Sequence, residues 1–270
     1  MKTFFQAPIL WISTMVHHKT LLRKFFTREI RGRFAGSMGG ALWLLVMPLC
    51  QILVYIFVFD AVLKIRLNSL HTGTDSFVLF FLTGMFPWLA FSEGLSRCSG
   101  ILYENSNLIT KVRFPIELLP TIGVLGSFVI NGCGFLIFTL YLGLIGKIGW
   151  QLIFTPLLFI LFFLMTIGFA AIISALSVFL KDIQQALPII LFVWFYFTPI
   201  LYPKEMVPEY FRYLFFINPV FPFMELFHSL LLGTTLSITH IVLSLSWTVA
   251  VCMFGLYLFS RLKTSFADVL

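Results

Sequence analysis

Long apolar runs separated by short polar segments extend along most of the chain. Five of these runs, at about residues 41–63, 77–96, 117–145, 150–179 and 238–260, are long enough to cross a bilayer as helices. A sixth predicted span carries the proline-bounded segment 188–203, PIILFVWFYFTPILYP. The pattern predicts an all-α integral membrane protein with six transmembrane helices.

The segment between the fifth and last predicted spans has a different pattern. Residues 204–213 are polar and mildly amphipathic, Asn218 and Pro219 interrupt the chain, and the apolar run 220–232 is too short to cross. This pattern predicts a re-entrant or interfacial pair of half-helices on the outer side. Counting residues 220–232 as a span would place the basic C-terminal tail outside.

Two polar regions are predicted to form amphipathic helices on the inner side. Residues 19–34 interleave basic residues with apolar residues at helical spacing, which predicts a helix lying in the membrane surface. Residues 97–120 form the one sizeable polar island, and apolar positions from Cys98 to Ile109 predict a short helix suited to docking a soluble partner. We therefore divide the chain into a cytosolic N-terminal segment, 1–40, and a six-span domain, 41–270.

The distribution of basic residues predicts which loops lie on the cytosolic side of the membrane. Short loops rich in Lys and Arg remain cytosolic, and the predicted spans place thirteen basic residues inside and five outside, with both termini cytosolic. The inner residues are Lys2, Lys19, Arg23, Lys24, Arg28, Arg31, Arg33, Arg97, Lys111, Arg113, Lys181, Arg261 and Lys263; the outer ones are Lys64, Arg66, Lys147, Lys204 and Arg212.

Composition narrows the functional classes. The chain is 60% hydrophobic and 11% charged, with a mean hydropathy of +1.01, which excludes a soluble domain. Its formal charge of +7 lies in juxtamembrane segments, so lipid headgroups rather than nucleic acid are the expected partners. Cysteines and histidines lack metal-ligand spacing, and no phosphate-binding glycine loop occurs. If ATP drives this protein, another chain binds it.

Acidic residues near span ends have simple structural explanations. Asp60 precedes Lys64 by one helical turn and Glu93 precedes Arg97 by one turn, so the spacing predicts two local ion pairs instead of a proton relay. Glu225 and His228 are also one turn apart. We interpret them as a hydrogen-bonded pair, with contact to a substrate at the exit as the alternative.

Aromatic and polar stripes recur on two predicted spans. The first consists of Gln51, Tyr55 and Phe59, and the second of Phe192, Phe195 and Tyr196. Aromatic rings stack on the C–H faces of sugars while Gln and Tyr exchange hydrogen bonds, so such stripes would let a glycan slide. Packing within the protein is the alternative.

Five segments, in order, resemble the membrane subunit of type-2 ABC exporters for lipid-linked bacterial polysaccharides, the group of O-antigen, teichoic acid and capsule permeases. The segments are FFTREIRGRFAGSMGGALW (25–43), NLITKVRFPIELLP (107–120), KDIQQALPIILFVWFYFTPILYP (181–203), INPVFPFMELFHSLLLG (217–233) and RLKTSFADVL (261–270). Together they cover nearly the whole chain. They are more specific for the permease type than for the polymer.

The resemblance implies a homodimer joined by two separate ATPase chains, which bind ATP and Mg²⁺ while this chain binds no cofactor. It implies export of an undecaprenyl-diphosphate-linked glycan across the bacterial cytoplasmic membrane, with O-antigen favoured. The helix near residues 103–111 would couple to the ATPase, and spans 1, 2 and 5 would surround the channel. The coupling candidates are Tyr103, Glu104, Asn107, Lys111 and Arg113; the channel candidates are Gln51, Tyr55, Phe59, Trp88, Phe192, Phe195 and Tyr196.

Arg28, Arg31 and Arg33 are candidates for binding the lipid diphosphate, because guanidinium groups suit phosphate oxygens. Anchoring on anionic lipid is the alternative for these three residues. Within the same architecture, exporters of teichoic acid, capsule, a drug or a lipid are alternatives. From another class, an ion-coupled carrier or a non-transporting scaffold remains, although no internal repeat supports the carrier.

Overall fold

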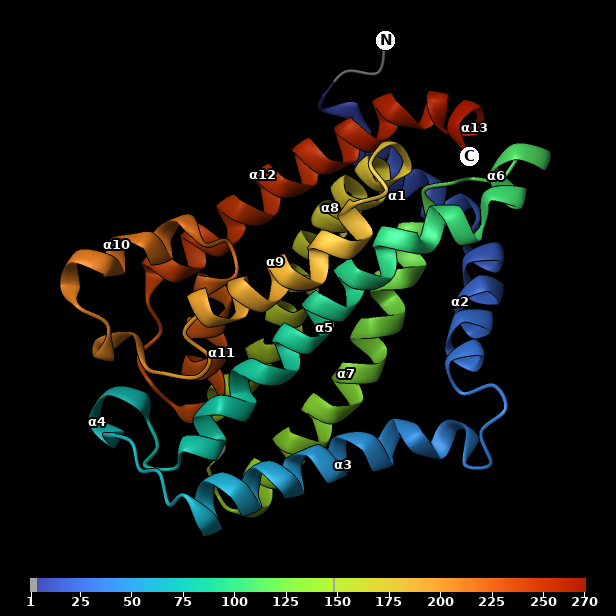
Figure 1. The fold of residues 1–270 in the computed structure, drawn as a ribbon. Helices are drawn as coiled ribbons and strands as arrows, with labels where there is room; N and C mark the ends of the chain where they lie inside the picture. The colour runs from blue at the N-terminus through green and yellow to red at the C-terminus, as the bar shows by residue number, and fades with distance from the viewer. Residues whose placement is uncertain (1–3, 148) are drawn as a thin grey trace.

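The long helices form a bundle, with shorter helices at its two ends (Figure 1). The structure is a computed structural model that describes residues 4–147 and 149–270; Lys2 and Ile148, which belong to the predicted inner face and outer turn, lie outside them. The principal helices are α1 (Gln6–His17), α2 (Lys19–Arg33), α3 (Trp43–Tyr55), α5 (Phe77–Glu104), α7 (Leu118–Leu144), α8 (Thr155–Phe179), α9 (Ile183–Phe197), α10 (Glu209–Ile217), α11 (Phe221–Leu232) and α12 (Ile238–Leu262).

Shorter helical elements connect or extend these helices. They are η1 (Gly40–Leu42), the π-helical η2 (Ile56–Val62), α4 (Ser69–Thr72), α6 (Ser106–Lys111), η3 (Trp150–Phe154), η4 (Lys204–Met206), η5 (Lys263–Ser265) and α13 (Phe266–Val269). Helices α2, α6 and α13 lie at one end, which we call the charged end, and α4 and α10 lie at the opposite end (Figure 1). The all-α class predicted from the sequence is confirmed.

Five helices within the described residues are long and apolar enough to cross a membrane. They are Gly40–Val62, Phe77–Glu104, Leu118–Leu144, Trp150–Phe179 and Ile238–Val269. They coincide with the five long runs predicted from the sequence, except that the last helical stretch continues past residue 260 to Val269 and that α5 extends beyond residue 96. This helix continues to Glu104, so Cys98, Ile101 and Leu102 belong to its buried face and not to a separate amphipathic helix.

The predicted fifth span is shorter than expected. Helix α9 has 15 residues, and at about 1.5 Å per residue it covers about 22 Å of a hydrocarbon core of about 30 Å. It ends at Phe197 because Thr198 precedes a proline, which disfavours helical backbone at Thr198. The count of six spans therefore remains a prediction.

The predicted half-helix pair corresponds to α10 and α11, which meet at a bend of 101°. The Trp194 indole donates to Asn218 Oδ1 at 2.8 Å, and Asn218 Nδ2 donates to Thr198 Oγ1 at 2.9 Å. Asn218, at the bend, is thus hydrogen-bonded to the end of α9. These bonds partner polar groups where two helices are interrupted, as a membrane environment requires.

The N-terminal segment contains a helix, α1, that the sequence analysis did not predict. Helix α1 buries Ala7 and Trp11. Trp11 Nε1 donates to Thr121 Oγ1 at 3.1 Å, and its ring lies 5.0 Å from Phe259. These contacts attach α1 to α7 and α12. Helix α2 follows it and covers the predicted amphipathic segment.

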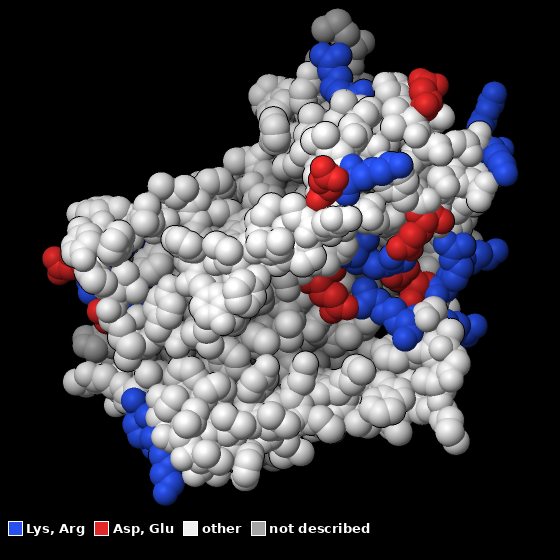
Figure 2. Space-filling view, viewed as in Figure 1, with Lys and Arg blue, Asp and Glu red and all other residues white. Residues whose placement is uncertain are grey.

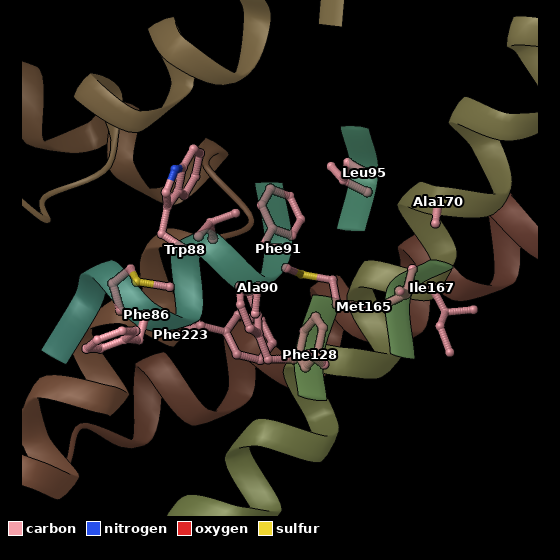
Figure 3. Packing of buried hydrophobic residues seen from close by; sticks show 14 of the residues in the cluster. Phe86, Trp88, Ala90, Phe91, Leu95, Phe128, Met165, Ile167, Ala170 and Phe223 are labelled. Atoms are coloured by element: carbon pink, nitrogen blue, oxygen red, sulfur yellow. The ribbon is translucent and has the colours of Figure 1, made fainter. Parts of the chain in front are cut away.

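The core is rich in aromatic side chains from different helices (Figure 3). Phe162 of α8 lies at its centre, with ring centroids 5.6 Å from Phe91, 6.0 Å from Phe128 and 4.9 Å from Phe223. These rings come from α5, α7 and α11. Stacked and tilted ring contacts of this kind add to the packing of the bundle.

Helices α8 and α12 approach at glycines. A Cβ atom placed on Gly255 would lie 2.1 Å from the carbonyl oxygen of Gly168, and one on Gly168 would lie 2.8 Å from the backbone of Val251. No side chain separates the two backbones at this crossing. Small residues allow such close contacts between membrane helices, where van der Waals packing replaces the hydrophobic effect.

We expect Gly255→Ala to destabilise the protein by about 1–3 kcal/mol, because its methyl group forces the two backbones apart. Thermal unfolding of the purified protein in detergent measures this effect. Gly32→Ala is the matched control, since no atom lies within 4 Å of a Cβ added to Gly32 in α2. Equal unfolding temperatures for Gly255→Ala and the unmodified protein would show that this contact is not required.

Candidate functional site

Charged side chains gather at the charged end, over α2 and the adjoining ends of α5 and α6 (Figure 2). They surround a cavity of about 820 Å³. The lining residues are Arg28, Glu29, Gly32, Arg33, Glu93, Ser96, Arg97, Glu104 and Asn105. The cavity therefore lies between the amphipathic helix α2 and the long membrane helix α5.

Arg97 of α5 makes three side-chain hydrogen bonds in this cavity. Its Nε and Nη2 donate to the two carboxylate oxygens of Glu29 at 2.7 and 3.1 Å, and its Nη1 donates to Glu104 at 2.7 Å. The contact with Glu29 is bidentate, which matches the planar guanidinium to the carboxylate and fixes their relative orientation. Arg97 thus connects α2 to α5.

A second ion pair lies beside the first. Arg33 of α2 pairs with Glu93 of α5, and its other terminal nitrogen donates to Ser127 of α7 at 3.1 Å. Asn131 of α7 also donates to Glu93. Three helices therefore meet at one group of polar side chains.

The local ion pairs predicted from spacing are wrong. Glu93 pairs with Arg33 and not with Arg97, because α2 brings its own charges to both residues. Asp60 pairs with Arg66 at 3.3 Å and not with Lys64. The helix ends at Val62, so Lys64 is no longer one helical turn from Asp60.

The arginines keep Glu29 ionised. Burial of this carboxylate by itself raises its pKa, but the hydrogen bond from Arg97 and the charges of Arg97, Arg33 and Arg28 lower it by more. The pKa of Glu29 therefore lies below its ordinary value. The carboxylate remains charged at neutral pH and can hold both neighbouring helices.

The three candidate diphosphate ligands have different surroundings. Arg33 is engaged with Glu93, and Arg28 lies 4.3 Å from the Phe25 ring and donates to Asn105 at 3.1 Å. Arg31 is exposed and makes no ion pair within the described residues. Three arginines and three glutamates line the cavity, so their formal charges cancel. A diphosphate would have to displace carboxylates there, and the role of these arginines stays a prediction.

The coupling candidates lie at the same end. Glu104, Asn107, Lys111 and Arg113 are exposed, in and beside α6. Tyr103 is half-buried, and its hydroxyl donates to the carbonyl of Val178 at 2.8 Å, which connects the ends of α5 and α8. The arrangement offers a short, polar, accessible helix joined directly to the end of a membrane helix.

The aromatic candidates occupy two places. Trp88, Phe192 and Phe195 border a groove of about 410 Å³ between α5 and α9, where Trp88 and Phe195 lie 5.6 Å apart. Trp88 is only 4% exposed, whereas Phe192 and its neighbour Tyr196 are exposed on α9. Two residues of the second predicted stripe, Phe192 and Phe195, thus lie in the same groove as Trp88.

The first stripe packs on a different part of α5. Tyr55 lies 5.0 Å from Phe81, and Phe59 lies 4.9 Å from Phe77. Gln51 is exposed on α3, most of whose side chains are exposed. The contacts of Tyr55 and Phe59 are those of packing within one chain, and a role in the channel stays a prediction.

The predicted pair of Glu225 and His228 is also wrong. Glu225 forms an ion pair with Lys204, and His228 Nε2 lies 3.1 Å from the carbonyl oxygen of Phe80. Spacing along α11 could not reveal these partners, because both come from distant segments. Both residues border a cavity at the opposite end of the molecule.

The fold and these sites define a polytopic α-helical membrane protein with an ionic contact at one end and an aromatic groove between two of its helices. Residues 20–232 match the family model described as the ABC-2 type transporter, and the chain belongs to this family. The protein is therefore a membrane subunit of the ABC-2 permease type.

Curated relatives align over most of the chain. It is 27% identical to the O-antigen export system permease protein RfbA of Klebsiella pneumoniae, over 93% of this chain and 95% of the relative. It is 27% identical to the protein of that name from Myxococcus xanthus, over 73% and 74%. It is 25% identical to the polysialic acid transport protein KpsM of Escherichia coli, over 77% and 80%.

A double-mutant cycle tests the link between α2 and α5. We expect Glu29→Gln and Arg97→Gln to couple by about 0.5–3 kcal/mol in thermal or denaturant unfolding, because the two residues share a partly buried bidentate contact. The matched control is the cycle of Arg97→Gln with Glu104→Gln. Glu104 is 53% exposed, so its coupling should be at most about 1 kcal/mol. Additive effects of Glu29 and Arg97 would contradict the link.

Stability should also depend on pH through Glu29. Its lowered pKa means that the contribution is fully present above the unfolded-state value of about 4.3 and is lost as the pH falls through the folded-state pKa. The difference in unfolding temperature between the unmodified protein and Glu29→Gln should therefore shrink below about pH 4. A difference that grows on acidification would contradict this assignment.

Proposed function

We propose that this chain is the channel-forming permease subunit of an ATP-driven exporter of a lipid-linked polysaccharide, with undecaprenyl-diphosphate-linked O-antigen as the substrate. The observation that carries the proposal is the similarity, over 93% and 73% of this chain, to two relatives named as O-antigen export permeases. Membership of the ABC-2 type transporter family supports the transporter class.

In this proposal a separate ATPase chain supplies the energy. The sequence has no phosphate-binding glycine loop, so two copies of a cytosolic ATPase would bind ATP and Mg²⁺. The exposed residues of α6 are the docking surface. Movement of α6 would reach α5 directly, since only Asn105 separates the two helices, and would reach α2 through Arg97 and Glu29.

The permease itself would work as a homodimer in the bacterial cytoplasmic membrane, with both termini in the cytosol. Most side chains of α3 and many of α9 are exposed apolar groups, which suits contact with a second copy or with lipid. A twofold dimer presents each surface twice. The groove beside Trp88 and Phe195 would then border the path of the glycan from both sides.

A second candidate is export of a capsule-type polysaccharide. The similarity to a protein named for polysialic acid transport favours it. This candidate shares the architecture and the ATPase requirement, and it differs in the polymer. Identification of the glycan that accumulates when export stops separates the two.

Deletion of the gene in its native bacterium tests the function. We expect surface polysaccharide to fall to background and a lipid-linked glycan to accumulate in the cytosolic leaflet, because the polymer is made inside and has no other route. Expression of the unmodified chain should restore the surface polymer. Unchanged surface polysaccharide after deletion would reject the proposal.

Substitutions in and beside α6 test the docking surface. We expect Arg113→Glu, and separately Leu108→Pro, to reduce co-purification of the ATPase and surface glycan several-fold, because they reverse an exposed charge and break a helix of six residues. Lys64→Glu, a charge reversal at the opposite end, is the matched control and should change neither. Normal complex assembly and export in both α6 variants would remove the proposed role.

A further inference from the structure

The cavity at the opposite end of the molecule differs from the charged-end cavity in size, lining and charge. It has a volume of about 690 Å³, within the range of about 300–1,000 Å³ typical of small-ligand sites. Residues of α4, α5, α10, α11 and α12 border it, together with the segments 203–205 and 233–237. Pro203 places it next to the chain that leaves the outer end of α9.

His228, which borders this cavity, has an unused hydrogen-bond acceptor. Its Nε2 lies 3.1 Å from the carbonyl oxygen of Phe80, and a carbonyl only accepts, so Nε2 carries the proton. Nδ1 of the neutral ring is then an acceptor. It is buried and has no partner within the described residues, although buried polar atoms are nearly always hydrogen-bonded. The Phe80 ring stacks on the imidazole at 4.0 Å and fixes its orientation.

Glu225 adds a second acceptor. One of its carboxylate oxygens, Oε2, pairs with Lys204, and the carboxylate side chain is 14% exposed. The other oxygen, Oε1, receives no hydrogen bond from the described residues. A ligand that satisfies His228 and Glu225 must therefore supply hydrogen-bond donors.

Charge and geometry narrow the class of that ligand. Lys204, Glu205 and Glu225 line the cavity with a formal charge of −1 when the histidines are neutral, so an anion such as a phosphate group is disfavoured. Within the described residues, no group of three or more His, Cys, Asp or Glu side chains is placed to hold a metal ion. A neutral, hydroxyl-rich molecule fits both acceptors.

An aromatic residue that lines the cavity also suits a neutral, hydroxyl-rich ligand. Phe216 borders the cavity, and its side chain is 46% exposed. An accessible aromatic ring can pack on the C–H face of a sugar, while the sugar hydroxyls donate to carboxylate and imidazole acceptors. A pyranose presents both kinds of surface.

We propose that this cavity binds neutral sugar residues of the glycan on the outer side of the membrane, as the chain leaves the exporter. The inference rests on the proposed function and adds a site that receives the glycan after it has passed the membrane. Glu225 and His228 accept hydrogen bonds from sugar hydroxyls, and Phe216 contacts the ring. Lys204 holds Glu225 in place.

Photo-crosslinking in cells tests the site directly. A benzoylphenylalanine incorporated at Phe216, in the otherwise unmodified permease with its ATPase, should form an adduct that reacts with glycan stain. The matched control is the same probe at Tyr213, which is 74% exposed on α10 but does not border the cavity. It should give no glycan adduct. Equal labelling at both positions, or an adduct at Phe216 that contains phospholipid instead of glycan, would overturn the proposal.

Two substitutions add residue-level evidence. His228→Gln keeps a donor for the Phe80 carbonyl and loses the Nδ1 acceptor. Glu225→Gln keeps the shape, but Lys204 takes its one carbonyl oxygen, so a donating NH2 group replaces the Oε1 acceptor. Each should lower glycan crosslinking at position 216 by about three- to tenfold, the effect of one hydrogen bond, while complex assembly is unchanged. Undiminished crosslinking in both variants would overturn the roles of these residues.

Different results would reject the proposed function and the proposed sugar site. If deletion of the gene leaves surface glycan unchanged, the proposed function fails and this inference fails with it. If deletion abolishes surface glycan but Phe216 captures none, the chain exports glycan and only the outer site is rejected.

Discussion

The ion pairs between α2 and α5 are the contact on which the arrangement of the charged end depends. Two partly buried arginines and two glutamates alternate across these helices, and each charge is partnered by one from the other helix. Partial burial makes an unpartnered charge costly, so removing one member leaves the others in an unfavourable position. The network therefore fixes the orientation of α2, which has no fully buried side chain of its own. Helix α6 follows the end of α5 and is placed by the same constraint.

Features that depend on long stretches of sequence were predictable. Five spans follow from apolar runs that exceed the thickness of a bilayer, and the bend at Asn218 follows from a run that is too short to cross. The family itself follows from several segments in order. Each of these patterns extends over many residues, so one exceptional residue does not change the prediction.

Features that depend on contacts between distant segments were not predictable. Glu93 has Arg97 one turn away along its own helix, but Arg33 becomes its partner because α2 folds against α5. The sequence analysis predicted no helix around Trp11, and the hydrogen bond from Trp11 to Thr121 shows how α1 is held in place. A helical spacing rule counts neighbours on one helix and has no information on what another helix brings.

In the candidate sites, too, the pattern within one helix was predictable and the contacts between helices were not. Spacing along α9 predicted that its aromatic residues share a face, yet nothing in it indicated that Trp88 of α5 would complete the groove. At the cavity opposite the charged end, the closeness of Glu225 and His228 in the sequence was misleading. Their partners are Lys204 and the Phe80 backbone, which lie 21 and 148 positions away.

The crossing at Gly168 and Gly255 has a mechanical consequence. Where side chains interdigitate, two helices can shift by changing rotamers, but two backbones in direct contact leave no such freedom. Sliding of α8 along α12 would drive the Gly168 carbonyl into neighbouring backbone atoms. Helices α8 and α12 should therefore move as one rigid unit during a transport cycle. Any change in the arrangement of the helices has to occur where side chains lie between them.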